Sequence, residues 1–297
     1  MAAAAHPARL GARSPICAIA SWPDMFDRAV FPPRKIAFIV ASTDHGTMIV
    51  NRFDYKMESE ASGFGVGFKI LNETSYEHSE ISVGSFILAS RRKHFGDGVV
   101  AVDCGANIGT HTVEWAKQMA KWGSVIAIEA QERIYYALAG NVAINNCFNV
   151  KLIHAAVGNR NGLMKIPNPD HFVPSSFGSL ELRPPRVPEN IGQKIDYSDS
   201  ALVSVRAITL DSLALRRVDL LKIDVEGMEC EVLEGAKRTI RQFLPVIIIE
   251  HLKAGPEKIA SALQHYGYRL AEMGVNILAA HPTDKTSDDL SASTPGA

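Results

Sequence analysis

Val99-Val-Ala-Val-Asp-Cys-Gly-Ala-Asn-Ile-Gly-Thr110 is the stretch of sequence that decides the fold. Residues 99–103 form a short apolar run that ends in a carboxylate, which predicts a buried strand. A helical pattern follows from residue 111 to residue 122, after a turn that contains Gly105 and Gly109. Because glycine has no Cβ, this turn can bend sharply and can let a ligand lie against its backbone. The stretch therefore predicts a βα unit with a ligand-binding turn.

Strand-like and helical segments alternate through the chain beyond this unit. Further strands are expected at residues 124–129, 150–157, 219–224 and 245–250, helices at 133–145, 228–243 and 256–266, and a closing hairpin at 268–279. This alternation is typical of an α/β fold with a mostly parallel twisted sheet and helices on both faces. Residues 158–208, rich in Pro, Ser, Asn and Gly, predict a β-rich insertion between the third and fourth strands.

The domain organisation follows from where this alternation begins and ends. We expect one domain at residues 96–282, preceded by a cap or lead-in at 31–95. Within the lead-in, residues 36–51 predict a strand-turn-strand, 63–67 a flexible loop and 80–95 a helix. Residues 1–30 and the Ser-, Asp- and Thr-rich residues 283–297 are expected to be disordered tails.

Composition narrows the class of partner. The 297 residues carry a formal net charge of -1, with 46% hydrophobic and 21% charged residues, and show no long Lys/Arg run. We therefore expect a small-molecule partner and no nucleic acid. No apolar stretch reaches 18 residues, so no membrane span is expected. The four cysteines form no CxxC motif, which favours reduced thiols in a cytoplasmic protein, and the sequence allows a homodimer.

Carboxylates gather at the ends of the predicted strands, where ligands bind in open parallel sheets. The turn after residue 103 lacks the middle glycine of a dinucleotide motif, and Asp103 would repel a phosphate. A cationic, phosphate-free ligand such as S-adenosylmethionine fits better. Glu129, twenty residues beyond Gly109, is placed to accept hydrogen bonds from ribose hydroxyls. The expected cofactor-binding residues are Asp103, Gly105, Asn107, Gly109, Thr110, Glu129, Ala156 and Asp224.

The candidate catalytic residues are Asp224, Glu226, Glu250 and His251, which follow the fourth and fifth strands. Methylation of an alcohol requires in-line positioning and a base within about 3 Å of the hydroxyl oxygen. Asp224 is the first candidate for this base or for the partner of the cofactor's ammonium, and Glu226 is the second. The three carboxylates could serve Mg²⁺, but they form no dedicated metal motif, so no metal is expected.

Four segments resemble the FkbM family of methyltransferases: residues 103–109, Leu221-Lys-Ile-Asp-Val-Glu-Gly227, residues 233–236 and residues 246–250. The resemblance covers about residues 96–282, and the Lys-Ile-Asp-Val-Glu-Gly run is its most specific part. It implies a class I Rossmann-like fold that uses S-adenosylmethionine, usually to methylate a hydroxyl on a sugar or secondary metabolite. His251 is a position where the resemblance implies variation.

Three other functions stay open at this point. A nicotinamide-dependent oxidoreductase would use a similar sheet, but the missing glycine in the first turn disfavours it. A nucleic-acid methyltransferase that acts on amino groups would carry Asn/Asp-Pro-Pro-Tyr after the fourth strand, where this chain has Asp224-Val-Glu-Gly227. A non-catalytic protein that binds S-adenosylmethionine would keep the fold without the chemistry.

Overall fold

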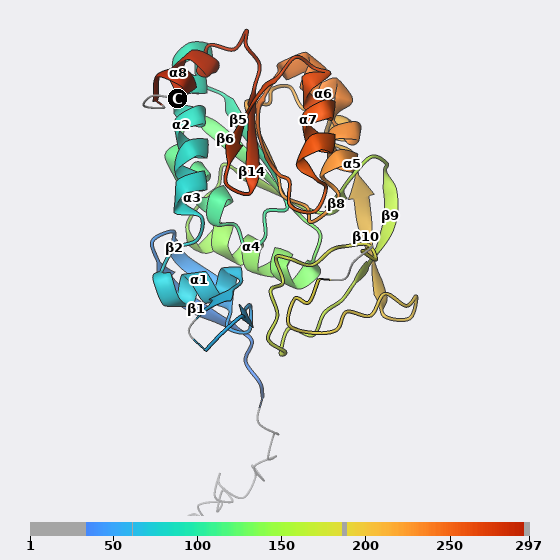
Figure 1. The fold of residues 1–297 in the computed structure, drawn as a ribbon. Helices are drawn as coiled ribbons and strands as arrows, with labels where there is room; N and C mark the ends of the chain where they lie inside the picture. Colours follow the sequence, from blue (N-terminus) through green and yellow to red (C-terminus); the bar gives the residue numbers. More distant parts are fainter. Residues whose placement is uncertain (1–33, 61, 186–188, 294–297) are drawn as a thin grey trace, which may run out of the picture. The chain divides into compact units, whose positions relative to one another are not determined.

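The computed structural model describes residues 34–60, 62–185 and 189–293, and its centre is a seven-stranded sheet (Figure 1). The strands, in the order in which they lie side by side, are β13 (Arg269–Met273), β14 (Asn276–Ala280), β12 (Val246–Glu250), β11 (Leu220–Ile223), β5 (Val99–Cys104), β6 (Gly123–Glu129) and β7 (Val150–His154). All neighbours are parallel except at β14, which is antiparallel to both β12 and β13. The expected closing hairpin and the class I Rossmann-like order are confirmed.

The order of the strands reverses between β5 and β11. The chain runs outward from β5 to β6 and β7, then returns to place β11 on the other side of β5. In sheets of this kind a crevice opens beyond the carboxyl ends of the strands at this switch point. The ends of β5 and β11 therefore form the base of any ligand site.

Helices cover both faces of the sheet because the strand residues alternate between two apolar surfaces. On one face, α2 (His78–Phe95), α3 (Thr110–Gln118) and α4 (Glu132–Ile144) bury residues such as Ala101 and Val125. On the other, α5 (Glu229–Gly235), α6 (Lys237–Phe243) and α7 (Pro256–Gln264) bury residues such as Val102 and Ile126. Figure 1 shows the sheet between these two layers.

The lead-in packs onto the same sheet. Its first two strands, β1 (Phe38–Thr43) and β2 (Gly46–Asn51), form the expected hairpin. The expected loop at residues 63–67 is wrong: β4 (Gly63–Phe64) pairs with β3 (Lys56–Met57), and α1 (Val66–Glu73) begins directly after it. Helix α2 then buries Ile87 and Leu88 against the sheet. The described residues from Ile36 onward consequently form one compact unit, with no division at residue 95.

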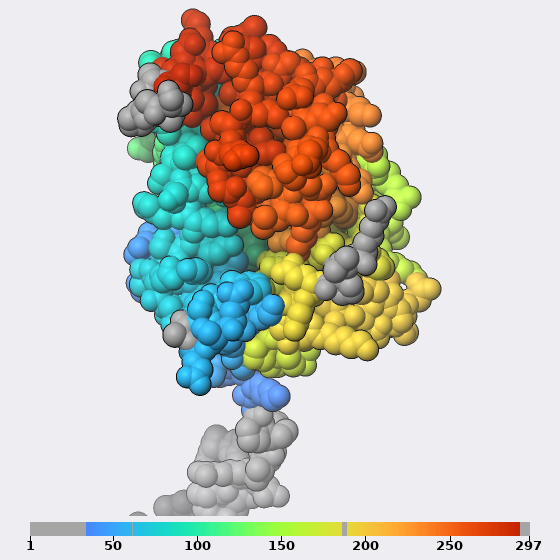
Figure 2. Space-filling model, viewed as in Figure 1, coloured from blue at the N-terminus to red at the C-terminus, as the bar shows by residue number. Residues whose placement is uncertain are grey.

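The insertion forms a small sheet and a long loop. Strand β10 (Leu202–Ile208) lies between β8 (Ala156–Val157), to which it is parallel, and β9 (Gly162–Pro167), to which it is antiparallel. The described part of the loop between β9 and β10 returns to the lead-in. There, the Phe177 N–H donates a 3.0 Å hydrogen bond to Asp54 Oδ1. Figure 2 shows the light-blue lead-in beside the yellow insertion on this face.

Two expectations about the C-terminal third require correction. The helix expected at residues 228–243 is two helices, α5 and α6, which meet at Ala236. The tail expected from residue 283 contains α8 (Thr286–Ser293), which packs against α2. Asp284 is buried and forms an ion pair with Arg91, which also binds Asp219 at 3.0 Å. The Arg91–Asp284 ion pair therefore anchors the segment that leads into α8. The tail expected at residues 1–30 lies outside the described residues.

Candidate active site

A cavity of about 230 Å³ lies at the carboxyl ends of the central strands. Its lining comes from the strand ends, the β5–α3 turn, the lead-in around α1 and the start of α2, and the insertion at residues 176–182. Of the residues expected to bind or react, those that line the cavity are Gly105, Asn107, Thr110, Glu129, Ala156, Asp224, Glu226 and Glu250. Asp103, Gly109 and His251 are not among the residues that line it.

The β5–α3 turn brings the backbone of two strands into direct contact. Gly105 has a φ of 80°, and a Cβ at this position would lie 1.6 Å from the backbone oxygen of Asp224. Only glycine fits there. Asn107, with a φ of 50°, and Thr110 line the cavity beside it. Gly109 instead packs at the start of α3, where a Cβ would lie 2.5 Å from Leu138. Its contribution is to the turn and not to the cavity surface.

Asp103 is buried beneath this turn. Its Oδ2 accepts a 2.6 Å hydrogen bond from Thr112 Oγ1, and its Oδ1 has no hydrogen-bond partner among the described residues. In the sheet Asp103 lies opposite Lys222. The Asp103 carboxylate thus lies behind the cavity. Direct contact with the cofactor was expected, but Asp103 does not line the cavity.

Glu129 ends β6 with both carboxylate oxygens fixed by backbone donors. Oε1 accepts a 2.7 Å hydrogen bond from the Gln131 N–H, and Oε2 accepts a 3.0 Å hydrogen bond from the Asn107 N–H. Burial raises the pKa of Glu129 to about 7, although these hydrogen bonds oppose the shift. Each oxygen retains a lone pair that can accept a further hydrogen bond.

Three carboxylates meet where β11 and β12 end. One oxygen of each of Asp224, Glu226 and Glu250 lies within 4.8 Å of the other two. Lysines neutralise two of them: Lys222 Nζ lies 2.9 Å from Asp224 Oδ2, and Lys253 Nζ lies 2.5 Å from Glu226 Oε2. Glu250 has no such partner, and its buried Oε2 accepts no hydrogen bond from the described chain.

The environment of Glu250 favours its protonated form. Burial, followed by the nearby charges of Asp224 and Glu229, raises the pKa of Glu250 to about 8. Burial and Asp224 also raise the pKa of Glu226 well above its usual range, against the opposing effect of Lys253. Glu250 is therefore a proton acceptor suited to neutral or slightly alkaline pH.

The carboxylates at the strand ends all point to the same face of the sheet, whereas His251 points to the opposite face. Asp103, Glu129, Asp224 and Glu250 occupy positions whose side chains alternate onto the face covered by α2, α3 and α4. His251 follows Glu250 directly and falls on the opposite alternation. Its backbone N–H donates a 3.1 Å hydrogen bond to the Val275 oxygen, which continues the strand pairing. His251 therefore does not line the cavity, and its role in the site stays a prediction.

The structure adds residues that were not predicted. Lys222, 3% exposed, points from the middle of β11 toward the cavity, where Tyr76, Glu77 and His111 also contribute to the lining. The sequence contained a signal for Lys222, which is a charged residue within the apolar run of β11. A lysine is rarely buried without partners, so its position indicates carboxylates nearby. Glu77 and His111 carried no such signal, because only the packing of α2 against α3 brings them together.

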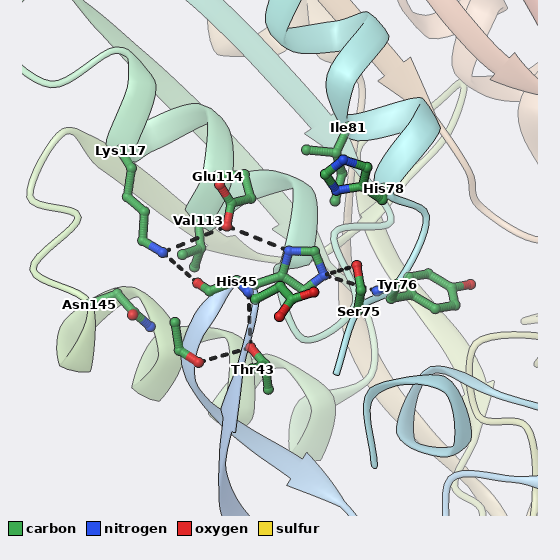
Figure 3. Close-up of polar contacts among 12 residues, drawn as sticks. Thr43, His45, Ser75, Tyr76, His78, Ile81, Val113, Glu114, Lys117 and Asn145 are labelled. Atoms are coloured by element: carbon green, nitrogen blue, oxygen red, sulfur yellow. Dashed lines mark hydrogen bonds and ion pairs between the residues drawn. The ribbon is translucent and has the colours of Figure 1, made fainter. Parts of the chain in front are cut away.

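His45 fixes the segment that carries Tyr76 and Glu77 (Figure 3). The Tyr76 N–H donates a 2.9 Å hydrogen bond to His45 Nε2, so Nδ1 carries the proton and faces Glu114 Oε1 at 3.5 Å. Lys117 Nζ donates a 2.5 Å hydrogen bond to the His45 backbone oxygen. The β1–β2 turn thereby connects α3 to the wall of the cavity.

Comparison with known proteins now adds to this geometry. Residues 103–270, more than half of the chain, match the model of the Methyltransferase FkbM domain. The chain belongs to the FkbM methyltransferase family. It is 26% identical over 169 residues to Methyltransferase sdnD of Sordaria araneosa and 25% identical over 169 residues to Methyltransferase 1 of Beauveria bassiana (strain ARSEF 2860). These matches cover 50% and 52% of the chain.

The chain spans just under two thirds of these relatives, 64% and 66% of their respective lengths. Among solved structures, Methyltransferase FkbM from Methylobacillus flagellatus KT matches with 15% identity and a TM-score of 0.43, over 62% of this chain and 43% of that chain. No helix in the described ranges is long and apolar enough to cross a membrane.

Proposed function

We propose that this FkbM methyltransferase transfers a methyl group from S-adenosylmethionine to a hydroxyl group of a small molecule such as a sugar or secondary metabolite. The observation that carries the proposal is the excess of carboxyl groups in the cavity, whose ionised forms a bound cation would stabilise. Five carboxylates line it, against the ammonium groups of Lys69 and Lys222; the carboxylates are those of Glu77, Glu129, Asp224, Glu226 and Glu250. Such a lining favours a sulfonium and disfavours the pyrophosphate of a dinucleotide or the backbone of a nucleic acid.

The residues of the cavity fit this cofactor. Gly105 presents its backbone to the cavity without a side chain, so a nucleoside can lie against it. The free lone pairs of Glu129 suit the two ribose hydroxyls, and Asp224 suits the ammonium. When bound, S-adenosylmethionine supplies an electrophilic methyl group on its sulfonium.

Glu250 is the proposed general base. Asp224, the first candidate from the sequence, is already paired with Lys222, whose Nζ lies 2.9 Å from Oδ2. Glu250 offers a buried oxygen without a hydrogen-bond partner among the described residues, and its pKa is raised to about 8. It can take the proton from the acceptor hydroxyl as that oxygen attacks the methyl group.

Calorimetry with the full chain tests the cofactor first. S-adenosylmethionine and S-adenosylhomocysteine should both bind, whereas NAD should give no heat. Incubation with S-adenosylmethionine and a panel of hydroxylated metabolites should then give a product heavier by one methylene, detected by mass spectrometry. The absence of heat with either sulfur nucleoside would exclude the proposal. Transfer to an amine, with alcohols unmodified, would exclude the hydroxyl acceptor.

A further inference from the structure

Two buried polar atoms face each other beside the cavity. Glu80 Oε1 and His111 Nε2 lie 3.1 Å apart, but neither has a hydrogen-bond partner within the described ranges. Their residues are 8% and 4% exposed. Glu77 Oε2 lies 3.7 Å from the same nitrogen, and the three atoms lie within 4.8 Å of one another. Buried polar atoms are almost always hydrogen-bonded, so two such atoms that meet only as an ion pair point to a ligand that the chain does not supply.

We propose that Glu77, Glu80 and His111 bind a divalent first-row transition-metal ion such as Zn²⁺ or Mn²⁺. Ligand atoms about 2.1 Å from one ion lie about 3.0–3.5 Å from each other, close to the separations found here. Two carboxylates with one imidazole suit these ions, whereas Mg²⁺ and Ca²⁺ prefer oxygen alone. His111 comes from α3, Glu80 comes from the first turn of α2, and Glu77 is the residue directly before α2.

The surrounding residues orient the ligands as metal sites require. Asn276 Nδ2 donates a 2.6 Å hydrogen bond to Glu80 Oε2, which leaves Oε1 directed at His111. Glu77 has a left-handed backbone with a φ of 49° immediately before α2. Non-glycine residues in this conformation are strained and concentrate at functional sites. The hydrogen bond that the Tyr76 N–H donates to His45 Nε2 holds this strained segment in position.

The carboxylates around the three ligands also favour the binding of a cation. Lys222 is surrounded by four carboxylates, those of Asp224, Glu80, Asp103 and Glu77. Its Nζ lies 2.9 Å from Asp224 Oδ2 and is more distant, at 3.8 Å, from Glu80 Oε1. In the neighbouring carboxylate cluster, by contrast, lysines already pair with Asp224 and Glu226. The additional positive charge therefore belongs beside His111.

The ion would face the cavity. Glu77 and His111 both line it, and three protein ligands leave coordination positions open, as in catalytic metal sites. On the proposed function, an open position would take an oxygen of the acceptor, and the ion would make its hydroxyl easier to deprotonate.

Cobalt binding to the full chain tests the site. After dialysis against a chelator, Co²⁺ should give visible d–d absorption at about one ion per chain, and Zn²⁺ should displace it. Glu77→Gln and His111→Asn should each weaken Co²⁺ binding tenfold or more. Glu77 is the more exposed ligand, with 29% of its side chain accessible, so its variant has the smaller effect on folding. Thermal unfolding verifies that each variant is folded.

Matched controls come from the same region. Glu73→Gln and His78→Asn remove an exposed carboxylate and an exposed imidazole close to the site, and both should bind Co²⁺ like the parent protein. The proposal is overturned if the parent binds no Co²⁺, or if Glu77→Gln and His111→Asn bind it unchanged. It is equally overturned if Glu226→Gln alone abolishes binding. S-adenosylhomocysteine binding by the chelated protein, measured in parallel, reports on the proposed function separately.

Discussion

Replacement of Glu250 by glutamine removes the proposed base while keeping its shape. The variant should lower kcat by about 10²–10³-fold, which is the usual contribution of a positioned general base. Cofactor affinity should change little, because the proposed cofactor contacts come from Glu129, Asp224 and the β5–α3 turn. Glu272→Gln, an exposed glutamate on the edge strand of the same sheet, is the matched control and should retain parental kcat.

The pH profile makes the test specific to Glu250. A carboxyl group with a pKa of about 8 is roughly one-tenth ionised at pH 7 and nine-tenths ionised at pH 9. Because the ionised form accepts the proton, kcat/KM, which reports the pKa of the free enzyme, should rise about tenfold between these pH values and then level off. Initial rates measured by release of S-adenosylhomocysteine give this curve. Glu250→Gln should abolish the rise. A variant that keeps the parental profile would refute the assignment of Glu250 as base.

Three further changes test the cavity. Glu129→Ala should weaken S-adenosylhomocysteine binding at least tenfold, about 1.4 kcal/mol, by calorimetry; unchanged affinity would remove Glu129 from the site. Gly105→Ala should abolish S-adenosylhomocysteine binding, because its Cβ would meet the backbone oxygen of Asp224. Gly274→Ala is the control: it also lies at positive φ, but with open space around it, and should lower the free energy of unfolding by only about 1 kcal/mol. Lys222→Met should lower that free energy by about 3–5 kcal/mol in urea unfolding, because buried carboxylates lose their counter-charge; a loss below about 1 kcal/mol would contradict the ion-pair interpretation.

The sheet could be predicted from the sequence because its signal is local. Each central strand is a short apolar run next to a helical pattern, and the carboxylate at the end of each run falls at the same edge of a parallel sheet. Glu129, Asp224 and Glu250 were predicted in this way, and all three line the cavity. His251 does not line it, because alternation along a strand places neighbouring residues on opposite faces of the sheet.

The parts that were not predicted depend on contacts between distant segments. Helix α8 looked like a polar tail, since nothing near Asp284 shows that Arg91 is its partner. Glu77 and Glu80 looked like ordinary polar residues at the start of a helix, and only the approach of α2 to α3 places them beside His111. Pairings of this kind have no periodicity to detect in a single sequence.

The two walls of the cavity differ in origin from its floor. The floor consists of strand ends within the sheet, whereas residues 64–69 and 176–182 form walls that lie outside it and are connected through Asp54, which accepts hydrogen bonds from Gly67 and Phe177. Exposed positions of the walls can therefore change without loss of the central fold, whereas Val66 and Phe177 belong to its core. Relatives that share the floor can diverge in the compounds they accept, and exchange of the insertion loop between two of them is a direct route to altered selectivity.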